Sequence, residues 1–223
     1  MLIKPTVAMI LAAGRGERMR PLTDHTPKPL LIVHDKPLIV WHIERLKKAG
    51  FSQLVINHAH LGEQIEHALG DGSSLGVSIT YSPEDTALET GGGIAHALPL
   101  LGERPFLVVN GDVWTDINYA ALALDEGDTA HLVLVNNPSH NPNGDFALNK
   151  GRVSVNGSDK LTFSGVGLYQ PHLFSDQSEE RFPLAPLLRN AMSQNTVSGQ
   201  HHQGIWTDVG TPERLAEINA SSQ

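Results

Sequence analysis

Cysteine is absent from the 223 residues of the sequence. Disulfide bonds, thiolate nucleophiles and cysteine-based zinc sites are therefore excluded. Aromatic residues are scarce, at 5% of the chain, and no apolar run approaches the roughly 18 residues that a membrane-spanning helix needs. The first residues, Met1 to Pro5, lack the layout of a signal peptide. These absences predict a soluble, cytoplasmic protein with no membrane partner.

Positive charge is also in short supply. Lysine and arginine together number 16 against 24 aspartates and glutamates, which gives a formal net charge of −8. Because nucleic-acid-binding domains are usually basic, we expect no nucleic acid among the partners. Hydrophobic residues make up 40% of the chain, enough for a sizeable core, and the length suits a single α/β domain spanning residues 1–223.

The first half of the chain alternates short apolar runs with helical patterns. The expected strands are residues 7–11, 54–56, 77–81 and 106–109, and the expected helices are residues 37–49, 61–69 and 91–98. This alternation predicts an α/β fold with a doubly wound, mostly parallel Rossmann-like sheet. Ligands of such sheets bind beyond the carboxyl ends of the strands, where the polar segments 12–29 and 110–112 fall.

The second half loses this alternation. Its expected strands are residues 130–135, 153–155, 161–169, 197–200 and 205–207, and its expected helices are residues 183–192 and 212–220. Residues 153–155 and 161–169 predict a β-hairpin, and residues 136–145 predict a loop. We therefore expect a small β-rich subregion for an acceptor rather than an independent second domain.

Small residues and cations are concentrated in the loop that follows the first expected strand. The small or apolar members are Leu11, Ala12, Ala13, Gly14 and Gly16, and the cations are Arg15, Arg18, Arg20 and Lys28. Small residues allow backbone N–H groups to approach anionic oxygens, and the cations neutralise the remaining charge. The loop therefore predicts a polyphosphate site.

Three interpretations of this loop compete. A plain turn with surface arginines would not require a core strand that leads into glycines and clustered cations. A dinucleotide-binding loop would carry a third glycine, where this chain has Met19, and a Walker loop would continue with Gly-Lys-Ser/Thr, which is missing. A loop that wraps a nucleoside triphosphate accounts for both the glycines and the cations.

Residues 11–23, Leu-Ala-Ala-Gly-Arg-Gly-Glu-Arg-Met-Arg-Pro-Leu-Thr, and the following Pro-Lys-Pro at 27–29 resemble the signature of the sugar-1-phosphate nucleotidyltransferases. Glu17 and Met19 depart from the usual Thr and Leu, but neither change removes a charge. The resemblance implies a GT-A-like fold in which residues 1–112 bind the nucleotide and residues 113–223 bind the sugar phosphate. It also implies that Lys28 and Arg18 are the catalytic cations and that residues 11–16 hold the ribose and triphosphate.

Two aspartates are candidate metal ligands. Asp112 follows the fourth expected strand, and Asp208 lies in Trp-Thr-Asp-Val-Gly-Thr, which resembles the family's Trp-x-Asp-x-Gly-Thr segment. Two carboxylates suffice for Mg²⁺, because phosphate oxygens and water complete its shell. The alternatives are an ordinary turn at Asp112 and a helix-capping anion at Asp208. We expect the neighbouring Asn110 to bind the sugar phosphate.

The segment before the third expected helix resembles the part of the family that contacts the base. Glu84, Thr90 and Gly91 match that pattern and are expected to bind the nucleotide, while Glu89 stands where a glycine is usual. The alternative is a flexible, glycine-rich helix start. Nothing in these residues selects a particular base.

The acceptor side departs further from the family. Gly144 and Asp145 resemble the segment that covers the sugar, although a solvated turn accounts for them equally well. The usual Glu-Lys-Pro triplet, whose lysine meets the sugar phosphate, is missing, and either Lys150 or Lys160 could replace that lysine. This departure indicates a non-standard sugar.

The resemblance implies transfer of a nucleotidyl group to a sugar 1-phosphate with release of pyrophosphate. It favours UTP and N-acetylmuramate 1-phosphate, with mannose or heptose 1-phosphate and a guanine nucleotide as the alternative. A GT-A glycosyltransferase would more often show Asp-x-Asp, where this chain reads Asp112-Val113-Trp114. A non-catalytic nucleotide-binding regulator would not need to keep all four candidate catalytic groups.

Overall fold

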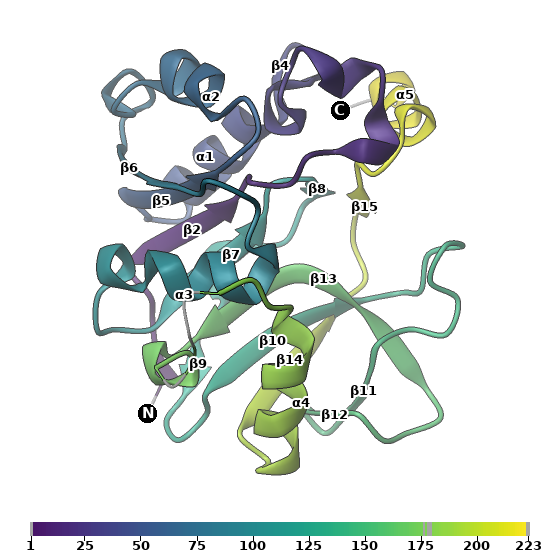
Figure 1. The fold of residues 1–223 in the computed structure, drawn as a ribbon. Coiled ribbons are helices and arrows are strands. Elements are labelled where there is room, and N and C mark those ends of the chain that lie inside the picture. Colours follow the sequence, from purple (N-terminus) through teal and green to yellow (C-terminus); the bar gives the residue numbers. More distant parts are fainter. Residues whose placement is uncertain (1, 176, 178–179, 222–223) are drawn as a thin grey trace.

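A nine-stranded mixed sheet runs through the protein in the order β10-β14-β12-β11-β13-β7-β2-β5-β6 (Figure 1). The structure is a computed structural model that describes residues 2–175, 177 and 180–221. Because the sheet includes strands from both halves of the chain, residues on either side of position 112 share one hydrogen-bonded framework.

The four strands β7, β2, β5 and β6 form the parallel part of the sheet. They span Val7–Leu11 (β2), Gln53–His58 (β5), Ser78–Pro83 (β6) and Phe106–Asn110 (β7). β2 pairs in parallel with both β5 and β7, and β5 pairs in parallel with β6. The near-continuous apolar character of β2 and β7 fits strands that are buried on both faces, whereas β6, at the edge of the sheet, alternates exposed and buried side chains. The expected strands of the first half are confirmed.

Helices cover both faces of this part of the sheet. The helices are α1 (Leu38–Lys48), α2 (Gly62–Leu69) and α3 (Glu89–Leu101), with α4 (Leu184–Ser193) from the second half. Because side chains alternate along a strand, Ala8 and Ile10 pack in the cluster that includes α1 and α2. Met9 packs in the opposite cluster, with α3 and α4. The protein therefore has a helix–sheet–helix layering (Figure 1).

The rest of the sheet is largely antiparallel. Its strands are β10 (Ala130–Val135), β11 (Phe146–Asn149), β12 (Arg152–Ser154), β13 (Lys160–Tyr169) and β14 (Val197–His202). β13 runs antiparallel to β7, β10 and β11, whereas β10 and β14 are parallel. The mostly parallel arrangement expected from the sequence is therefore limited to the four strands above and the β10–β14 pair.

The hairpin predicted between residues 153–155 and 161–169 is wrong. β11 lies between β12 and β13 and pairs with both strands. Lys150 and Gly151 connect β11 to β12 with φ values of 47° and 77°, the backbone conformation of a tight hairpin turn. The prediction failed because residues 146–149, which follow the predicted loop, were assigned to no strand.

Short elements complete the structure. The two-stranded sheets pair β1 (Leu2–Ile3) with β9 (Leu124–Asp125), β3 (Ile32–Val33) with β4 (Lys36–Pro37), and β8 (Val113–Thr115) with β15 (Trp206–Asp208). The helix α5 (Pro212–Ala220) is capped by Thr211. The 3-10 helices are Glu17–Met19, Leu22–Asp24, Lys28–Leu30, Ser73–Leu75, Tyr119–Ala121 and Pro171–Leu173. None of the helices in the described residues has the length and apolar character to cross a bilayer.

The carboxyl ends of β2 and β7 lie side by side, with Leu11 opposite Asn110. Gly111 donates its backbone N–H to the Leu11 carbonyl at 2.9 Å. A Cβ atom at Gly111 would lie 2.6 Å from that carbonyl oxygen, so the close approach of the two strand ends requires glycine. The two polar segments after these strands are thereby brought to one edge of the sheet.

Candidate active site

The glycine loop after β2 has a fixed backbone. Gly16 adopts a left-handed conformation, with φ of 69°, and its carbonyl accepts hydrogen bonds from Met19 N at 2.9 Å and Thr23 Oγ1 at 2.8 Å. A Cβ atom at Gly16 would meet Thr23 Cγ2 at 3.0 Å. Met19 is fully buried, so an apolar residue at that position packs in the core. The loop is a defined surface rather than a loose turn.

A cavity of about 210 Å³, called the loop cavity below, opens beside this backbone. It is lined by most of the residues predicted for the nucleotide, the catalytic cations and the metal: Leu11, Ala12, Ala13, Gly14, Gly16, Lys28, Thr90 and Asp112. Asn110, which was predicted for the sugar phosphate, lines it as well. Asn57, Ala87 and Glu89 also line it. Residues that lie far apart in the sequence thus surround one space at the carboxyl ends of β2, β5 and β7.

Lys28 and Asp112 form an ion pair on the wall of the loop cavity. Lys28 Nζ donates to Asp112 Oδ2 at 2.6 Å, and the lysine side chain is only 11% exposed. Charge-assisted hydrogen bonds in partly buried sites are strong, so the ammonium group is held in place. A cation and an oxygen ligand are both available where an anionic ligand would lie.

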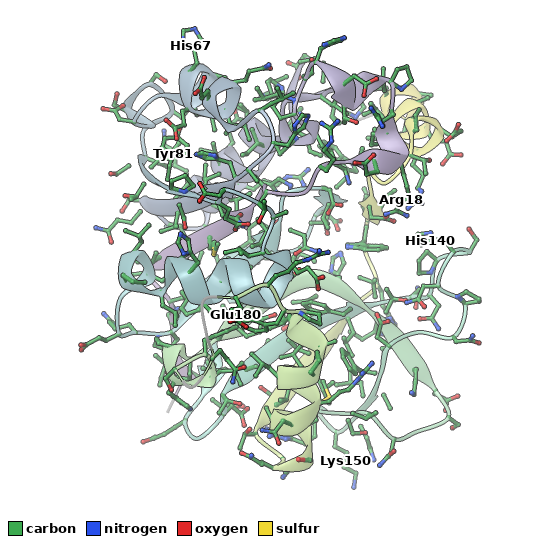
Figure 2. All side chains as sticks on the ribbon, in the orientation of Figure 1. Arg18, His67, Tyr81, His140, Lys150 and Glu180 are labelled. Carbon is green, nitrogen blue, oxygen red and sulfur yellow. The ribbon has the colours of Figure 1, made fainter. Side chains whose placement is uncertain are left out.

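The two predicted arginines, Arg15 and Arg18, do not line the loop cavity as Lys28 does. Arg15 contacts His60 and lies 3.3 Å from Glu17, with its Nε facing Glu17 Oε1. Burial and the charge of Arg15 lower the pKa of His60 below its ordinary value. Arg18 is exposed and does not line the loop cavity. Figure 2 shows it on the same side of the molecule as His140.

Glu84 belongs to a buried hydrogen-bond chain. Asn57 Oδ1 accepts from Ala12 N at 2.8 Å, and Asn57 Nδ2 donates to Glu84 Oε1 at 2.6 Å. Glu84 Oε2 accepts from Leu88 N at 2.8 Å. Glu84 is 6% exposed and does not line the loop cavity. The carboxylate therefore connects the glycine loop to the start of α3 through Asn57.

The sequence interpretation missed Asn57. This residue is the second-last of β5 and lies opposite Leu11 in the neighbouring strand. A polar side chain at the carboxyl end of an apolar strand, adjacent to the glycine loop, is the signal that could have identified it.

At the start of α3, the predicted residues Thr90 and Gly91 have different surroundings. Thr90 lines the loop cavity, whereas Gly91 packs against another segment. A Cβ atom at Gly91 would lie 2.4 Å from Phe182 Cε2, and Phe182 exchanges backbone hydrogen bonds with Leu88 and Gly92 at 3.1 Å each. Gly91 thus allows close packing of that segment on α3.

Asp208 lies next to Asp112 through the β8–β15 pair. Asp208 is opposite Val113, and Val209 N donates to the Asp112 carbonyl at 2.7 Å. Asp208 Oδ2 is paired with Arg214. Its Oδ1 atom is buried and accepts no hydrogen bond from a described residue, although His140 Nε2 lies 3.1 Å away.

The unfilled oxygen of Asp208 and the half-exposed carboxylate of Asp112 fit a hard divalent cation. Within the described part of the chain, no group of three or more histidines and carboxylates is arranged to hold a metal ion. A cation at this position would therefore need further oxygens from a bound phosphate or from water.

A second cavity of about 600 Å³, called the outer cavity below, adjoins the first. Glu89, Thr90 and Asn110 line both cavities. The outer cavity is further lined by Gly144, Asp145, Phe146, Lys160, Phe163, Pro183, Leu184, Ala185, Leu188 and Arg189. The predicted residues Asn110, Gly144 and Asp145 are thereby brought together.

Asp145 both lines the outer cavity and fixes its wall. Its Oδ2 accepts from Phe163 N at 2.8 Å, and its Oδ1 accepts from Asn141 Nδ2 at 3.2 Å. Of the two lysines considered for the missing triplet, Lys160 lines the cavity, whereas Lys150 lies in the β11–β12 turn. Figure 2 shows Lys150 at the far end of the molecule.

A profile of the family described as nucleotidyl transferase matches residues 7–148. The chain belongs to this nucleotidyl transferase family. It is 62% identical to the N-acetylmuramate alpha-1-phosphate uridylyltransferase of Neisseria meningitidis over 96% of both chains. It is 35% identical to the protein of the same name from Caulobacter vibrioides, covering 96% of this chain and 98% of the relative. The family predicted from the glycine loop is confirmed, and the chain is a nucleotidyltransferase.

Solved structures support the fold. HddC from Yersinia pseudotuberculosis, in complex with GMP-PN, superimposes with a TM-score of 0.77 at 18% identity and covers 96% of this chain and 98% of its own. A Bacillus anthracis protein assigned as a glucose-1-phosphate thymidylyltransferase superimposes with a TM-score of 0.83 at 21% identity, with 96% and 93% coverage. The predicted α/β class is confirmed.

Proposed function

We propose that the protein transfers the uridylyl group of UTP to N-acetylmuramate 1-phosphate, which yields UDP-N-acetylmuramate and pyrophosphate. The observation that carries this proposal is the pair of adjoining cavities that share Glu89, Thr90 and Asn110. One has the phosphate-binding loop and the other has room for a sugar. The names of the relatives from N. meningitidis and C. vibrioides supply the substrate pair.

The division of the cavities supports the proposed organisation of the chain. The residues of the loop cavity all lie within 1–112, which is the proposed nucleotide-binding core. The outer cavity draws mainly on residues 144–189, within the proposed sugar-phosphate-binding part at 113–223. We propose that both parts form one GT-A-like domain, with the Rossmann-like arrangement confined to its parallel strands.

The reaction needs positioning rather than a nucleophilic side chain. An oxygen of the acceptor's phosphate forms a bond to the α-phosphorus of UTP, and the bond from that phosphorus to the bridging oxygen breaks. Pyrophosphate leaves with the electron pair. Because the attacking phosphate is already ionised at pH 7, no general base is required. The main barrier is repulsion between two anions, which fixed positive groups reduce.

The chain supplies these groups from several sides. The small residues from Ala12 to Gly16 present backbone N–H groups to the triphosphate, and Lys28 neutralises charge at the reacting phosphates. Arg18 and Arg15 bind the outer phosphates of the donor, a role that suits the exposure of Arg18. Thr90 binds the nucleotide at the start of α3, and Gly91 supports it by letting the Phe182 segment pack on that helix. Glu84 acts through Asn57 by holding the loop.

Asp112 and Asp208 would hold a divalent cation, which we propose to be Mg²⁺. The bound ion would neutralise phosphate oxygens and fix their orientation. Asn110, Gly144 and Asp145 line the side of the acceptor. Because UTP is a cytoplasmic metabolite, we also propose that the protein acts in the cytoplasm.

A substrate matrix tests this proposal. The purified protein is incubated with each of four nucleoside triphosphates and with sugar 1-phosphates that include N-acetylmuramate, N-acetylglucosamine, mannose and heptose derivatives. Pyrophosphate release is then measured with and without Mg²⁺. We expect the highest kcat/KM for UTP with N-acetylmuramate 1-phosphate. Preference for GTP with mannose or heptose 1-phosphate would assign the guanylyltransferase reaction instead.

A further inference from the structure

Two cations of the outer cavity lack a counter-charge among the residues that the structure describes. Lys160, at the start of β13, and Arg189, on α4, both line the cavity. Neither side chain makes an ion pair or a hydrogen bond with a residue that the structure describes. Both charges are therefore open to a ligand in the cavity that they share. The unpaired charges point to an anionic ligand.

The carboxylates of the same cavity are already engaged. Glu89 Oε1 lies 3.0 Å from Arg181 Nε, and the oxygens of Asp145 accept hydrogen bonds from Phe163 N and Asn141. These carboxylates therefore do not neutralise Lys160 or Arg189 by direct contact.

Lys160 lies away from the boundary between the two cavities. Gly165 marks this boundary on β13, because a Cβ atom there would lie 2.5 Å from Asn110 Nδ2. Lys160 precedes Gly165 by five residues, roughly 16 Å along an extended strand. The reacting phosphate of an acceptor must lie near the boundary to reach the donor, so Lys160 is placed for a more distant group.

Arg189, on α4, also lies away from the boundary between the two cavities. α4 begins near Phe182, which is hydrogen-bonded to Leu88 before α3, and Arg189 lies five residues after Leu184. Five helical residues advance about 7.5 Å along the axis. Figure 1 shows α4 running away from α3 alongside the sheet. The two cations thus line the outer cavity from β13 and from α4, away from the boundary.

We propose that Lys160 and Arg189 form a subsite for a carboxylate that the acceptor carries on a side arm, away from its 1-phosphate. The proposal rests on the proposed function, because N-acetylmuramate 1-phosphate has such a group in its lactyl ether. The planar guanidinium of Arg189 binds a carboxylate through two parallel hydrogen bonds, and Lys160 adds a compact positive charge. N-acetylglucosamine 1-phosphate is the same sugar without the lactyl group.

Matched acceptors and matched variants test the subsite. The variants Arg189→Gln and Lys160→Gln remove one charge each, and Arg104→Gln removes a charge from an exposed position outside both cavities. With saturating UTP, kcat/KM is measured for N-acetylmuramate 1-phosphate and for N-acetylglucosamine 1-phosphate. Each cavity variant should lower the value for the first acceptor about tenfold and leave the second unchanged, since a charged hydrogen bond is lost only with the carboxylate.

The double variant should lose the preference between the two acceptors, and Arg104→Gln should behave as wild type with both. The KM for UTP should stay constant throughout. Equal losses with both acceptors would mean that the cations serve the phosphate, and no loss with either would make them surface charges. Both results overturn the subsite. A wild-type protein that releases no pyrophosphate from UTP with any sugar 1-phosphate would instead overturn the proposed function.

Discussion

The loop cavity and the outer cavity are built in opposite ways. In the loop cavity the polar groups are tied to one another: Lys28 to Asp112 at 2.6 Å, and Ala12 to Asn57 at 2.8 Å. In the outer cavity, Lys160 and Arg189 remain unpaired with any described residue. The first arrangement fixes the geometry of a reaction, and the second leaves charges for a ligand to complete.

The largest effect should come from the cation of the loop cavity. Lys28→Ala should lower kcat about 100- to 1000-fold, because a preorganised positive group next to the reacting phosphates is lost. Pyrophosphate release at saturating substrates measures the effect. Lys36→Ala is the control, since Lys36 pairs with Glu44 outside both cavities. Wild-type turnover in folded Lys28→Ala would remove Lys28 from the mechanism.

The two carboxylates next to this lysine should control the dependence on metal ions. Asp112→Asn and Asp208→Asn should each raise the Mg²⁺ concentration for half-maximal activity at least about tenfold, because a charged oxygen ligand is lost. Asp116→Asn provides a control on the same β8–β15 region, since Asp116 pairs with His202. If the magnesium titration is unchanged in both cavity variants, the site formed by the two aspartates is wrong.

The buried chain beneath the glycine loop should matter less for turnover than for stability. Glu84→Gln replaces one acceptor oxygen with an amide that faces a donor, either Asn57 Nδ2 or Leu88 N. The free energy of unfolding should fall by about 1–3 kcal/mol. Chemical denaturation measures this change, and the KM for UTP should rise several-fold while the KM for the acceptor stays constant. Glu103→Gln, at an exposed position, should alter neither quantity. An unchanged stability would show that the Glu84 hydrogen bonds contribute little.

A smaller effect should appear in the β10–β14 part of the sheet, which lies outside both cavities. Burial lowers the pKa of His131 in the folded protein below its ordinary value of 6.5. The unfolded chain therefore binds a proton more readily near that pH, so stability is retained above it and decreases as the pH falls through it. His131→Gln cannot titrate, and its melting temperature should fall less than that of the wild type between pH 7.5 and pH 5. Parallel melting profiles for both proteins would contradict this assignment.

The contrast between the cavities also explains what the sequence could predict. The glycine loop and its cations lie within 19 consecutive positions, from Leu11 to Pro29, so their chemistry is visible without a structure. The central strands β2 and β7 were recognisable because they are buried on both faces and are therefore almost purely apolar. The same pattern predicted the edge at which Asp112 meets the loop.

The parts of the fold and site that depend on contacts between distant residues could not be predicted from the sequence. Asn57 and Glu84 act through hydrogen bonds between side chains 27 residues apart, which spacing alone does not reveal. β11 was missed because four residues are too few to show a clear alternation of apolar and polar side chains. As a result, the predicted partner of β12 was wrong. The cations of the outer cavity come from β13 and α4, and only the folded chain places Lys160 and Arg189 around the same space.

A crystal structure with UDP-N-acetylmuramate bound would test the two-cavity arrangement most directly. The account predicts that the uridine and its phosphate lie in the loop cavity, against Ala12, Gly14 and Thr90, and that the sugar lies in the outer cavity beside Asp145. The two halves of the product should meet at Asn110. A product held wholly within one cavity, or bound away from Lys28, would contradict the account.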